Sequence, residues 1–373
     1  MEVLGYGTQS KDKKFEPMVF ERQDVRKGEV GLKVTHCGVC HSDLHQARND
    51  WENTNYPCIP GHEVVGEVTS VGEGVSKFKV GDKVGIGCMV NSCQQCDPCK
   101  KGIEQFCEGP KSCTLTYNGT KNPDGTNTYG GYSTDMMVRE EFLLRIPKGL
   151  EPEYAGPIMC AGITVYSPMK HWNLQKGQRL GVAGVGGLGH MAIKIGKTLG
   201  AKVVAFTRNA DKKDKILAMG ADEVVVSKSD EEMQKAAQSL DMLINTIPVG
   251  HDINPYINLM KPNSTLVLVG NLMGFNEVAS GPLVFNRISL VGSLIGGIEE
   301  TQEVLDLCAE NNIKPDIKMI QIQEIDDVYD TLASGNDGDF RHVIDMDSLR
   351  NLDETKRKSA TKIDSPNRGE VVS

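Results

Sequence analysis

Short runs of alternating apolar and polar residues dominate the chain up to about residue 150. Typical runs are residues 29–35, 64–71 and 83–87, and glycine and aspartate separate them. Alternation with a period of two is typical of strands that bury one face, and glycine and aspartate favour turns between such strands. The pattern therefore predicts a β-rich, barrel-like domain.

The pattern changes between residues 162 and 294, where compact apolar runs replace the alternating ones. We predict strands at residues 179–183, 202–206, 223–226, 241–245, 265–269 and 289–291. Residues 188–199 and 211–219 have the composition and spacing of helices and lie between the earlier strands. Alternation of strand and helix predicts an α/β domain, with a doubly wound parallel sheet covered by helices on both faces.

The remainder of the chain predicts a return to the first domain and then a tail. A helix is expected near residues 301–310, and the strand-like residues 342–345 are expected to rejoin the first domain. The last 25 residues, from Leu349, are polar with mixed charge, which is typical of disorder. We therefore divide the chain into a first domain of residues 1–161 completed by 295–348, a second domain of 162–294, and a disordered tail of 349–373.

Composition narrows the class of protein. The chain has 373 residues, 39% of them hydrophobic, which suffices for two domains with substantial cores. Its net charge of -9 argues against nucleic acid as a partner, because phosphate binding needs a basic surface. No apolar run approaches the roughly 20 residues needed to cross a bilayer. Eleven cysteines and no signal-peptide core at the N-terminus indicate a cytoplasmic protein whose thiols serve metals or chemistry.

Four of the cysteines lie within fifteen residues, in the spacing C-x2-C-x2-C-x7-C: Cys93, Cys96, Cys99 and Cys107. Thiolates at such short spacing match a closed tetrahedral zinc site, which stabilises a loop and performs no chemistry. Ferredoxin-type iron–sulfur runs continue with C-x3-C-P, which is absent here. Disulfides are the other alternative, but they suit an exported chain better. We therefore predict a structural zinc.

A glycine-rich turn follows the predicted strand 179–183 and opens a predicted helix: Gly184, Val185, Gly186, Gly187, Leu188 and Gly189. A G-x-G-x-x-G match alone is weak in a chain with 40 glycines, but its place between strand and helix is the one that a dinucleotide-binding turn requires. Gly184 allows the tight turn, Gly186 lets the backbone approach a pyrophosphate, and Gly189 lets the helix pack on the strand. The helix N-terminus then offers its N–H groups to the phosphates. The alternative is a tight turn without a ligand.

The type of dinucleotide depends on the residues that follow the second strand of this domain. About 20 residues after the turn, an acidic residue would bind the ribose 2′-hydroxyl of NAD. Thr207 and Arg208 occupy that position, and Lys212 follows. A hydroxyl and a guanidinium suit a 2′-phosphate, because arginine forms charge-assisted and often bidentate bonds to phosphate. We predict NADP(H) rather than NAD, although Arg208 as an ordinary surface residue is the alternative.

Three further segments complete a recognisable set: GVCHSDLH at residues 38–45, GHEVVG at 61–66 and MCAGIT at 159–164. With them the chain resembles the zinc-containing medium-chain alcohol dehydrogenases, and within these the cinnamyl-alcohol-dehydrogenase-like, NADP-dependent aldehyde reductases. The resemblance covers nearly all of residues 1–348, with the motifs in the family's order. It implies that the first domain is a GroES-like catalytic domain and the second a Rossmann domain.

The resemblance also implies a second zinc, which would be catalytic and held by Cys40, His62 and Cys160, with water or substrate in the fourth position, as this family is known to arrange it. Two thiolates and an imidazole leave the ion acidic enough to polarise a carbonyl oxygen. Without the resemblance, Cys40 and Cys160 are equally well read as buried small residues and His62 as a structural histidine, because the three lie far apart in the sequence.

Neighbouring polar residues acquire roles by the same resemblance. Asp43 would orient a ligand histidine, and Glu63 would lie behind the zinc and assist exchange of the bound water. Ser42 would contact the substrate oxygen and pass a proton by way of the cofactor ribose to His45, because a hydroxyl donates and accepts and an imidazole titrates near neutral pH. The alternative for His45 is a solvated helix residue.

Several more positions match family features. Thr164 would pack on the nicotinamide, Ser293 would contact it from the strand that also builds a dimer sheet, and Arg341 would face a phosphate. Trp51 falls in the segment that lines the substrate pocket, where an aromatic or extended apolar aldehyde would stack; a core-packing tryptophan is the alternative. The remaining cysteines match no ligand position and are interpreted as structural thiols: Cys37, Cys58, Cys88, Cys113 and Cys308.

The sequence thus predicts a zinc-dependent alcohol dehydrogenase that acts mainly as an aldehyde reductase, transfers hydride between NADP(H) and primary alcohols or aldehydes, and forms a homodimer. One rival is an NAD-dependent alcohol dehydrogenase. The other is a zinc- and nucleotide-binding protein without catalysis, whose sequence would have lost a ligand. Here all the expected ligand positions and Glu63 are intact.

Overall fold

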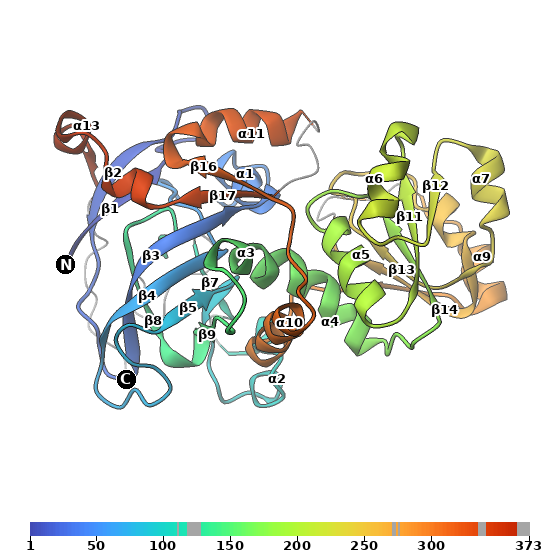
Figure 1. Ribbon diagram of the computed structural model, residues 1–373, viewed down its shortest axis with the longest axis horizontal. Helices are drawn as coiled ribbons and strands as arrows, with labels where there is room; N and C mark the ends of the chain where they lie inside the picture. The colour runs from blue at the N-terminus through green and yellow to red at the C-terminus, as the bar shows by residue number, and fades with distance from the viewer. Residues whose placement is uncertain (110–111, 118–127, 271–273, 275–276, 335–340, 364–373) are drawn as a thin grey trace. The chain divides into compact units, whose positions relative to one another are not determined.

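The computed structural model divides the chain into two compact units (Figure 1). Unit 1 comprises Met1–Cys160 and Gly296–Ser373, and unit 2 comprises Ala161–Ile295. The two boundaries between the units each lie one residue from those expected, and residues from 349 onward belong to unit 1. The structure describes residues 1–109, 112–117, 128–270, 274, 277–334 and 341–363. Among these, no helix is long and apolar enough to span a membrane.

Unit 1 is built on a seven-stranded sheet in the order β16-β17-β3-β4-β5-β9, with β8 paired to β3, as far as the described residues go. Its strands are β3 (Glu29–Val39), β4 (Val64–Val71), β5 (Lys83–Ile86), β8 (Asp135–Arg139), β9 (Leu144–Arg145), β16 (Ile317–Gln321) and β17 (Arg341–Asp345). The predicted return of residues 342–345 is confirmed, since β17 pairs antiparallel with β3. Strand β3 is longer than predicted and ends just before Cys40, which places that cysteine at the end of the sheet.

Smaller elements complete unit 1. One sheet holds β1 (Glu2–Gly7), β2 (Glu16–Glu21) and β18 (Thr361–Lys362), and β6 (Met89–Asn91) pairs antiparallel with β7 (Thr114–Leu115) in a two-stranded sheet. The helices are α1 (His41–Ala47), α2 (Asp97–Lys100), α3 (Pro152–Pro157), α10 (Ile298–Glu310), α11 (Ile325–Ala333), α12 (Asp347–Arg350) and α13 (Glu354–Lys358). The largest fully buried side chains of the unit, among them Tyr132 and Phe142, form its core. The predicted β-rich domain is confirmed.

Unit 2 is a six-stranded parallel sheet in the order β12-β11-β10-β13-β14-β15. The strands are β10 (Arg179–Ala183), β11 (Lys202–Thr207), β12 (Glu223–Val226), β13 (Leu240–Asn245), β14 (Met260–Leu268) and β15 (Ser289–Gly292). The helices are α4 (Ile163–His171), α5 (Gly189–Thr198), α6 (Lys213–Ala218), α7 (Asp230–Lys235), α8 (Asn254–Ile257) and α9 (Ser280–Asn286). The strand order reverses at β10, the point at which open parallel sheets bind ligands. The predicted doubly wound α/β domain is confirmed.

Two connectors join the units. The first is helical and continues from α3 through a π-helical turn, η3 (Ile158–Gly162), into α4. Pro157 ends α3 and has no N–H to donate, so the regular helix cannot continue through it, and the wider turn follows. The second connector passes from Ile295 through two glycines into α10.

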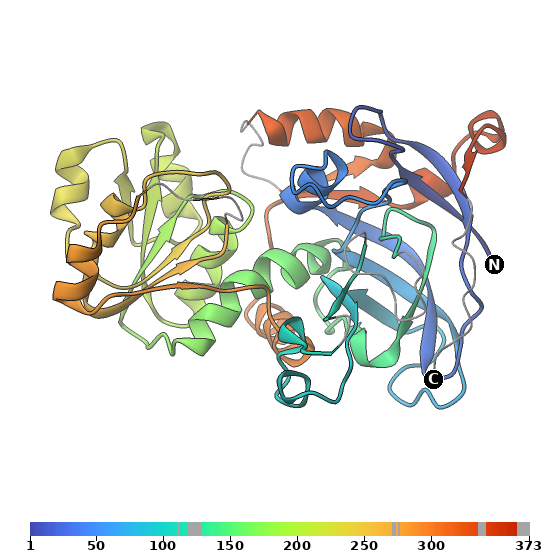
Figure 2. The same cartoon turned by 180° about the vertical axis from the view of Figure 1, so that it is seen from behind.

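The prediction of a disordered tail from Leu349 onward is wrong for the described part of that segment. Leu349 and Leu352 are buried, and the Arg350 guanidinium donates to the main-chain carbonyl of Thr134 at 2.7 Å. Strand β18 then pairs in parallel with β2, and the segment lies beside β1 and β2 in both views (Figures 1 and 2). A few anchoring side chains thus order a segment whose composition is otherwise polar. Residues 364–373 lie outside the described residues.

Candidate metal centres and dinucleotide-binding turn

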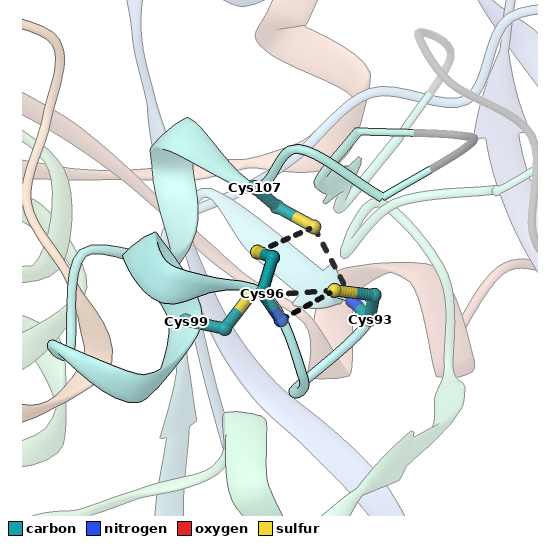
Figure 3. A group of neighbouring side chains, drawn as sticks. All are labelled: Cys93, Cys96, Cys99 and Cys107. Atoms are coloured by element: carbon teal, nitrogen blue, oxygen red, sulfur yellow. Dashed lines mark hydrogen bonds between the residues drawn. The ribbon is translucent and has the colours of Figure 1, made fainter.

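Four sulfur atoms converge in the segment of residues 93–109, here called the cysteine lobe. Figure 3 shows the side chains of Cys93, Cys96, Cys99 and Cys107 pointing toward one another, with all four sulfurs within 4.8 Å of each other. Cys93 and Cys99 are 4.0 Å apart at Sγ, and Cys96 and Cys107 are 3.9 Å apart. Around a tetrahedral zinc with Zn–S bonds of about 2.3 Å, two sulfurs lie about 3.8 Å apart. The lobe therefore fits zinc, whereas the separations exclude disulfides.

Main-chain N–H groups prepare the lobe for a cation. Those of Gln95 and Cys96 donate to Cys93 Sγ at 3.5 and 3.4 Å, and that of Gly109 donates to Cys107 Sγ at 3.4 Å. The bonds from Gln95 and Cys96 hold the pKa of the Cys93 thiol down to about 6. A thiolate is the metal-binding form of cysteine. The loop therefore stabilises the form of Cys93 that binds a metal ion.

A second group of side chains, here called the deep site, brings together residues that are distant in the sequence. Cys40 lies at the start of α1, His62 in the loop before β4, and Cys160 in the π-helical turn η3. Cys40 and Cys160 are 3.8 Å apart at Sγ, and His62 Nε2 lies 3.1 Å from Cys160 Sγ. All three side chains are buried. The sulfur separation again matches a tetrahedral zinc, so the predicted trio fits the metal.

Asp43 ties the segments of the deep site together. Its Oδ1 accepts from His62 Nδ1 at 3.0 Å and from the Gly61 N–H at 3.1 Å, while Oδ2 accepts from the Cys40 N–H at 2.8 Å. Burial alone would lower the pKa of His62, but the Asp43 carboxylate together with the thiols of Cys88 and Cys40 outweighs burial and raises that pKa well above the usual value. The carboxylate thus orients the imidazole with Nε2 toward the sulfurs and favours positive charge at the site.

A buried ion pair lies beside the ligands. The side chains of Glu63 and Arg341 pair at 0% and 3% exposure, and Arg341 Nη1 lies 4.0 Å from Cys40 Sγ. Glu63 Oε1 takes the arginine, but Oε2 is buried without a partner among the described residues. Its carboxylate belongs to the same close group as the two sulfurs and His62. An unpaired carboxylate oxygen at this place fits a site that receives a cation.

The glycine turn of unit 2 has the conformation that a pyrophosphate needs. Gly184 has a φ of 87°, and a Cβ on Gly189 would collide with the Gly184 carbonyl oxygen, so both positions require glycine. A Cβ on Gly186 would meet nothing within 4 Å, which leaves open space beside the main chain. Thr246 Oγ1 holds the turn by donating to the Gly184 carbonyl at 2.8 Å. The turn therefore leads from β10 into α5 with room for a phosphate.

The predicted 2′-phosphate residues follow the neighbouring strand. Thr207 ends β11 and is 8% exposed, Arg208 is exposed, and Lys212 lies in a 3₁₀ turn, η4 (Ala210–Lys212). Because β10 and β11 are parallel neighbours, these residues reach the same edge of the sheet as the glycine turn. Thr164 lies in α4, and Ser293 follows β15, so both also belong to unit 2. Arg341 belongs to unit 1, where it pairs with Glu63.

Comparison with known proteins agrees with this arrangement. Residues 26–148 match the alcohol dehydrogenase GroES-like domain, and residues 187–310 match the zinc-binding dehydrogenase domain. The chain is 43% identical over 354 residues to aldehyde reductase YahK of Escherichia coli (strain K12), an alignment that covers 94% of this chain and 99% of that protein. The chain belongs to the zinc-containing alcohol dehydrogenase family.

Two further relatives and two solved structures each match 93% of this chain. Cinnamyl alcohol dehydrogenase 2 of Rauvolfia serpentina is 42% identical over 93% of this chain and 95% of its own, and NADP-dependent alcohol dehydrogenase C 1 of Mycolicibacterium smegmatis is 41% identical over 93% and 99%. A cinnamyl alcohol dehydrogenase of Sorghum bicolor superposes with a TM-score of 0.88 at 37% identity, over 93% of this chain and 98% of that one. A cinnamyl alcohol dehydrogenase of Helicobacter pylori complexed with NADP(H) gives 0.86 at 40% identity, over 93% and 99%.

Helix α1 carries the predicted proton path of the dehydrogenase, with one residue that the sequence did not reveal. Ser42 Oγ lies 3.7 Å from Cys40 Sγ, and His45 follows one turn later. His45 Nδ1 pairs with Asp50 Oδ2 at 2.7 Å, and the two side chains are 31% and 44% exposed. The Trp51 ring lies 5.7 Å from that of His45 and is only partly buried, so it is not a core residue. The missed signal was an acidic residue just past the helix that carries the histidine.

Cys88 also has a place that its spacing did not predict. The residue is only partly buried, and its Sγ lies 4.0 Å from the carbonyl oxygen of Met159, the residue that precedes Cys160. Cys88 therefore lies beside the deep site without belonging to its group of possible ligand atoms, and its interpretation as a structural thiol stays a prediction. The contact arises where the chain turns after β5 toward η3, and no sequence motif marks that turn. The other four unassigned cysteines are buried, as expected: Cys37, Cys58, Cys113 and Cys308.

Proposed function

We propose that this dehydrogenase reduces aldehydes with NADPH, using a zinc ion in the deep site, and oxidises primary alcohols in the reverse direction. The proposal rests on the buried group of Cys40, His62 and Cys160, whose two sulfurs are separated by the distance expected around a tetrahedral zinc. Asp43 orients the His62 ring within this group. The names of an aldehyde reductase and an NADP-dependent alcohol dehydrogenase among the relatives support the reaction and the cofactor.

The deep site differs from the cysteine lobe in the number of protein ligands. Zinc bound by two thiolates and one imidazole supplies a Lewis acid that polarises a carbonyl oxygen in the open position. Asp43 accepts the Nδ1 proton of His62 and so keeps Nε2 available as a ligand atom. Glu63 Oε1 pairs with Arg341, Oε2 has no partner among the described residues, and the carboxylate lies within 4.8 Å of the ligand atoms, which suits a role in exchange of the bound water.

Proton supply falls to helix α1. Ser42 lies beside Cys40, where its hydroxyl is placed to donate to the oxygen of the reduced substrate. His45 is one turn away and partly exposed, so it can replace that proton from solvent, and Asp50 fixes the orientation of its ring. Trp51 beside His45 offers an aromatic face to an aromatic or extended apolar aldehyde.

Cofactor binding falls to unit 2. NADPH supplies the hydride when bound. The open backbone at Gly186 and the start of α5 suit its pyrophosphate, and Thr207, Arg208 and Lys212 suit its 2′-phosphate because a hydroxyl and two cations replace the acidic residue of NAD-binding proteins. Thr164 and Ser293 are assigned to the nicotinamide end. Arg341 lies in unit 1 and pairs there with Glu63, so its contact with a phosphate stays a prediction of the family resemblance.

The enzyme is further proposed to be a cytoplasmic homodimer. Strand β15 is the edge of the six-stranded sheet, and an edge strand offers unpaired main-chain groups to a second copy. Val284 and Phe285 on the neighbouring helix α9 are 75% and 90% exposed, and exposed apolar side chains of this size mark an interface.

The proposal is tested by measuring kcat/KM for benzaldehyde reduction with NADPH and with NADH. We expect NADPH to be preferred and Arg208→Ala to raise the KM for NADPH about tenfold while leaving that for NADH unchanged, since one charge-assisted bond to phosphate is lost. Lys202→Ala removes an exposed cation at the opposite end of β11 and serves as the control. A preference for NADH would overturn the choice of cofactor, and failure to reduce any of a panel of aldehydes would overturn the reaction.

A further inference from the structure

We propose that Glu104 is a positioning residue, which fixes the point where the chain returns from unit 2 to unit 1 and thereby supports dinucleotide binding. The cysteine lobe carries Glu104, so the lobe metal would act on the cofactor step through this side chain. The anchor itself follows from contacts within unit 1. Its consequence for the cofactor rests on the proposed function.

Glu104 caps a helix from outside it. The residue lies in a 3₁₀ turn of the lobe, η1 (Glu104–Phe106), is 9% exposed, and accepts the Ile298 N–H on Oε2 at 3.1 Å. Ile298 is the first residue of α10, and the preceding residue, Gly297, has no side chain with which to cap it. Helix N-termini leave N–H groups without internal partners, and a carboxylate there is stabilising. Glu104 therefore replaces the missing cap.

The same turn packs against the connector. A Cβ on Gly297 would collide with the carbonyl oxygen of Gly102, so the two main chains touch. The teal lobe lies beside the orange helix α10 when seen from the front and from behind (Figures 1 and 2). One short segment of the lobe, residues 102–104, thus holds the last residue before α10 and the first residue within it.

The lobe metal would fix both ends of that segment. Cys99 and Cys107 belong to the metal-binding group and flank it. The Gly102 N–H donates to the Cys99 carbonyl at 3.1 Å, and the Cys107 N–H donates to the Glu104 carbonyl at 3.0 Å. Holding the two cysteines at one ion therefore restrains the backbone that carries the Glu104 side chain.

The anchored point is the second connector. Unit 2 ends at Ile295, and only Gly296 and Gly297 separate it from the bonded Ile298 N–H. Later in α10, Gln302 exchanges two hydrogen bonds with the main chain of Arg145, so the helix is tied to unit 1 beyond its first turn as well. Without Glu104, the two glycines and the first turn of α10 would gain conformational freedom.

That freedom has a consequence for cofactor binding, because the connector leads directly out of unit 2, which carries the proposed dinucleotide-binding turn. The other connector is a continuous helical segment that carries the ligand Cys160. A loose second connector has to be ordered when the dinucleotide binds, which costs affinity. Once the cofactor is bound, the connector is already ordered, so kcat at saturating NADPH would be unchanged.

The test compares Glu104→Ala, Glu104→Gln and Glu310→Ala with the wild-type protein. Deuterium exchange is measured on each protein without cofactor, and the Kd, KM and kcat are measured with NADPH. Glu310 is an exposed glutamate at the far end of α10 and is the matched control. In Glu104→Ala we expect the amides of residues 297–301 to exchange with deuterium at least about tenfold faster, because a hydrogen bond to a charged acceptor is lost. The Kd and KM for NADPH rise about threefold to tenfold while kcat stays within about twofold of wild type. Glu104→Gln keeps an acceptor and restores wild-type exchange.

Two results would overturn the proposal: unchanged exchange at residues 297–301 in Glu104→Ala, or faster exchange with an unchanged Kd for NADPH, which would make Glu104 a structural cap only. If Glu104→Ala does not fold, Glu104→Asp, whose side chain is too short to reach Ile298, is measured in its place. Cys99→Ala is expected to reproduce the faster exchange. The proposed function is judged separately, by the activity of the wild-type enzyme.

Discussion

The cysteine lobe takes its four sulfurs from one stretch of fifteen residues, whereas the deep site joins Cys40 and Cys160 across 120 residues of chain. The lobe sulfurs receive main-chain N–H groups from their own loop, and two of the four cysteines are only partly buried. The deep-site ligands are all buried, and Asp43 orients His62 from helix α1, whereas His62 itself lies in the loop before β4.

This contrast separates a structural site from a reactive one. Four equivalent thiolates leave zinc no open position, so the lobe can only brace its surroundings. Two thiolates and an imidazole leave one position, and the buried carboxylates of Asp43 and Glu63 are placed to control charge around it. We therefore expect catalysis at the deep site, whose ligands are brought together only by the fold. The cysteine lobe, whose ligands are close in the sequence, is expected to contribute to stability.

The largest expected effect comes from removing a ligand of the deep site. His62→Ala should lower kcat/KM for aldehyde reduction by about a thousandfold or more, because the Lewis acid contributes several kcal/mol. Zinc content should fall by the deep-site ion alone. His171→Ala, an exposed histidine at the end of α4, is the control and should match wild type. Substantial reduction by His62→Ala would break the distinction between the two sites.

A smaller effect is expected when the ligand stays and its orienting carboxylate is neutralised. Asp43→Asn keeps the shape of the side chain but weakens its bond to His62, so deep-site zinc affinity or activity should fall about tenfold to a hundredfold. Competition with a chelator measures this loss. The lobe ion should be retained as in wild type, and loss of both ions together would show that the sites are not independent.

A smaller effect still is expected at the outer end of the proton path. Asp50→Asn should lower kcat by at most about fivefold, because the pair with His45 is partly exposed and screened by water. Asp24→Asn, a fully exposed aspartate, provides the baseline. A loss of kcat as large as that in Asp43→Asn would show that Asp50 is as important for catalysis as the residues of the deep site.

The smallest effect on turnover is expected in the lobe. Cys99→Ala should lose one zinc and lower the Tm by about 5 °C or more, while kcat at saturating NADPH stays within about twofold of wild type. Metal analysis and thermal unfolding measure the two quantities. Unchanged melting with half the zinc would contradict the bracing role.

Much of the fold follows from local patterns, because buried parallel strands are continuous apolar runs. Strands β10 and β12 begin and end where predicted, whereas β14 begins at Met260, earlier than predicted, since its first residues include Pro262 and Asn263 and do not form an apolar run. The tail prediction failed for a related reason, as Leu349 and Leu352 order a polar segment through tertiary contacts that composition does not show.

The candidate sites divide in the same way. The cysteine lobe was predictable because cysteines so close together in the sequence must also lie close together in space. The glycine turn was predictable because it lies between a predicted strand and a predicted helix. The trio of the deep site required a family resemblance, since nothing in the separation of Cys40, His62 and Cys160 implies contact. Asp50 and Cys88 were found only in the structure. An acidic residue five positions after His45 does not by itself predict a pair, and the contact of Cys88 with Met159 joins segments 71 residues apart.

The central claim is that the deep site, and not the lobe, performs the chemistry. It is tested most directly in Cys40→Ser, by measuring benzaldehyde reduction with NADPH together with zinc content and NADPH binding. We predict one zinc fewer per chain, no detectable reduction, and NADPH binding close to that of wild type. Wild-type-like turnover by this variant would contradict the account.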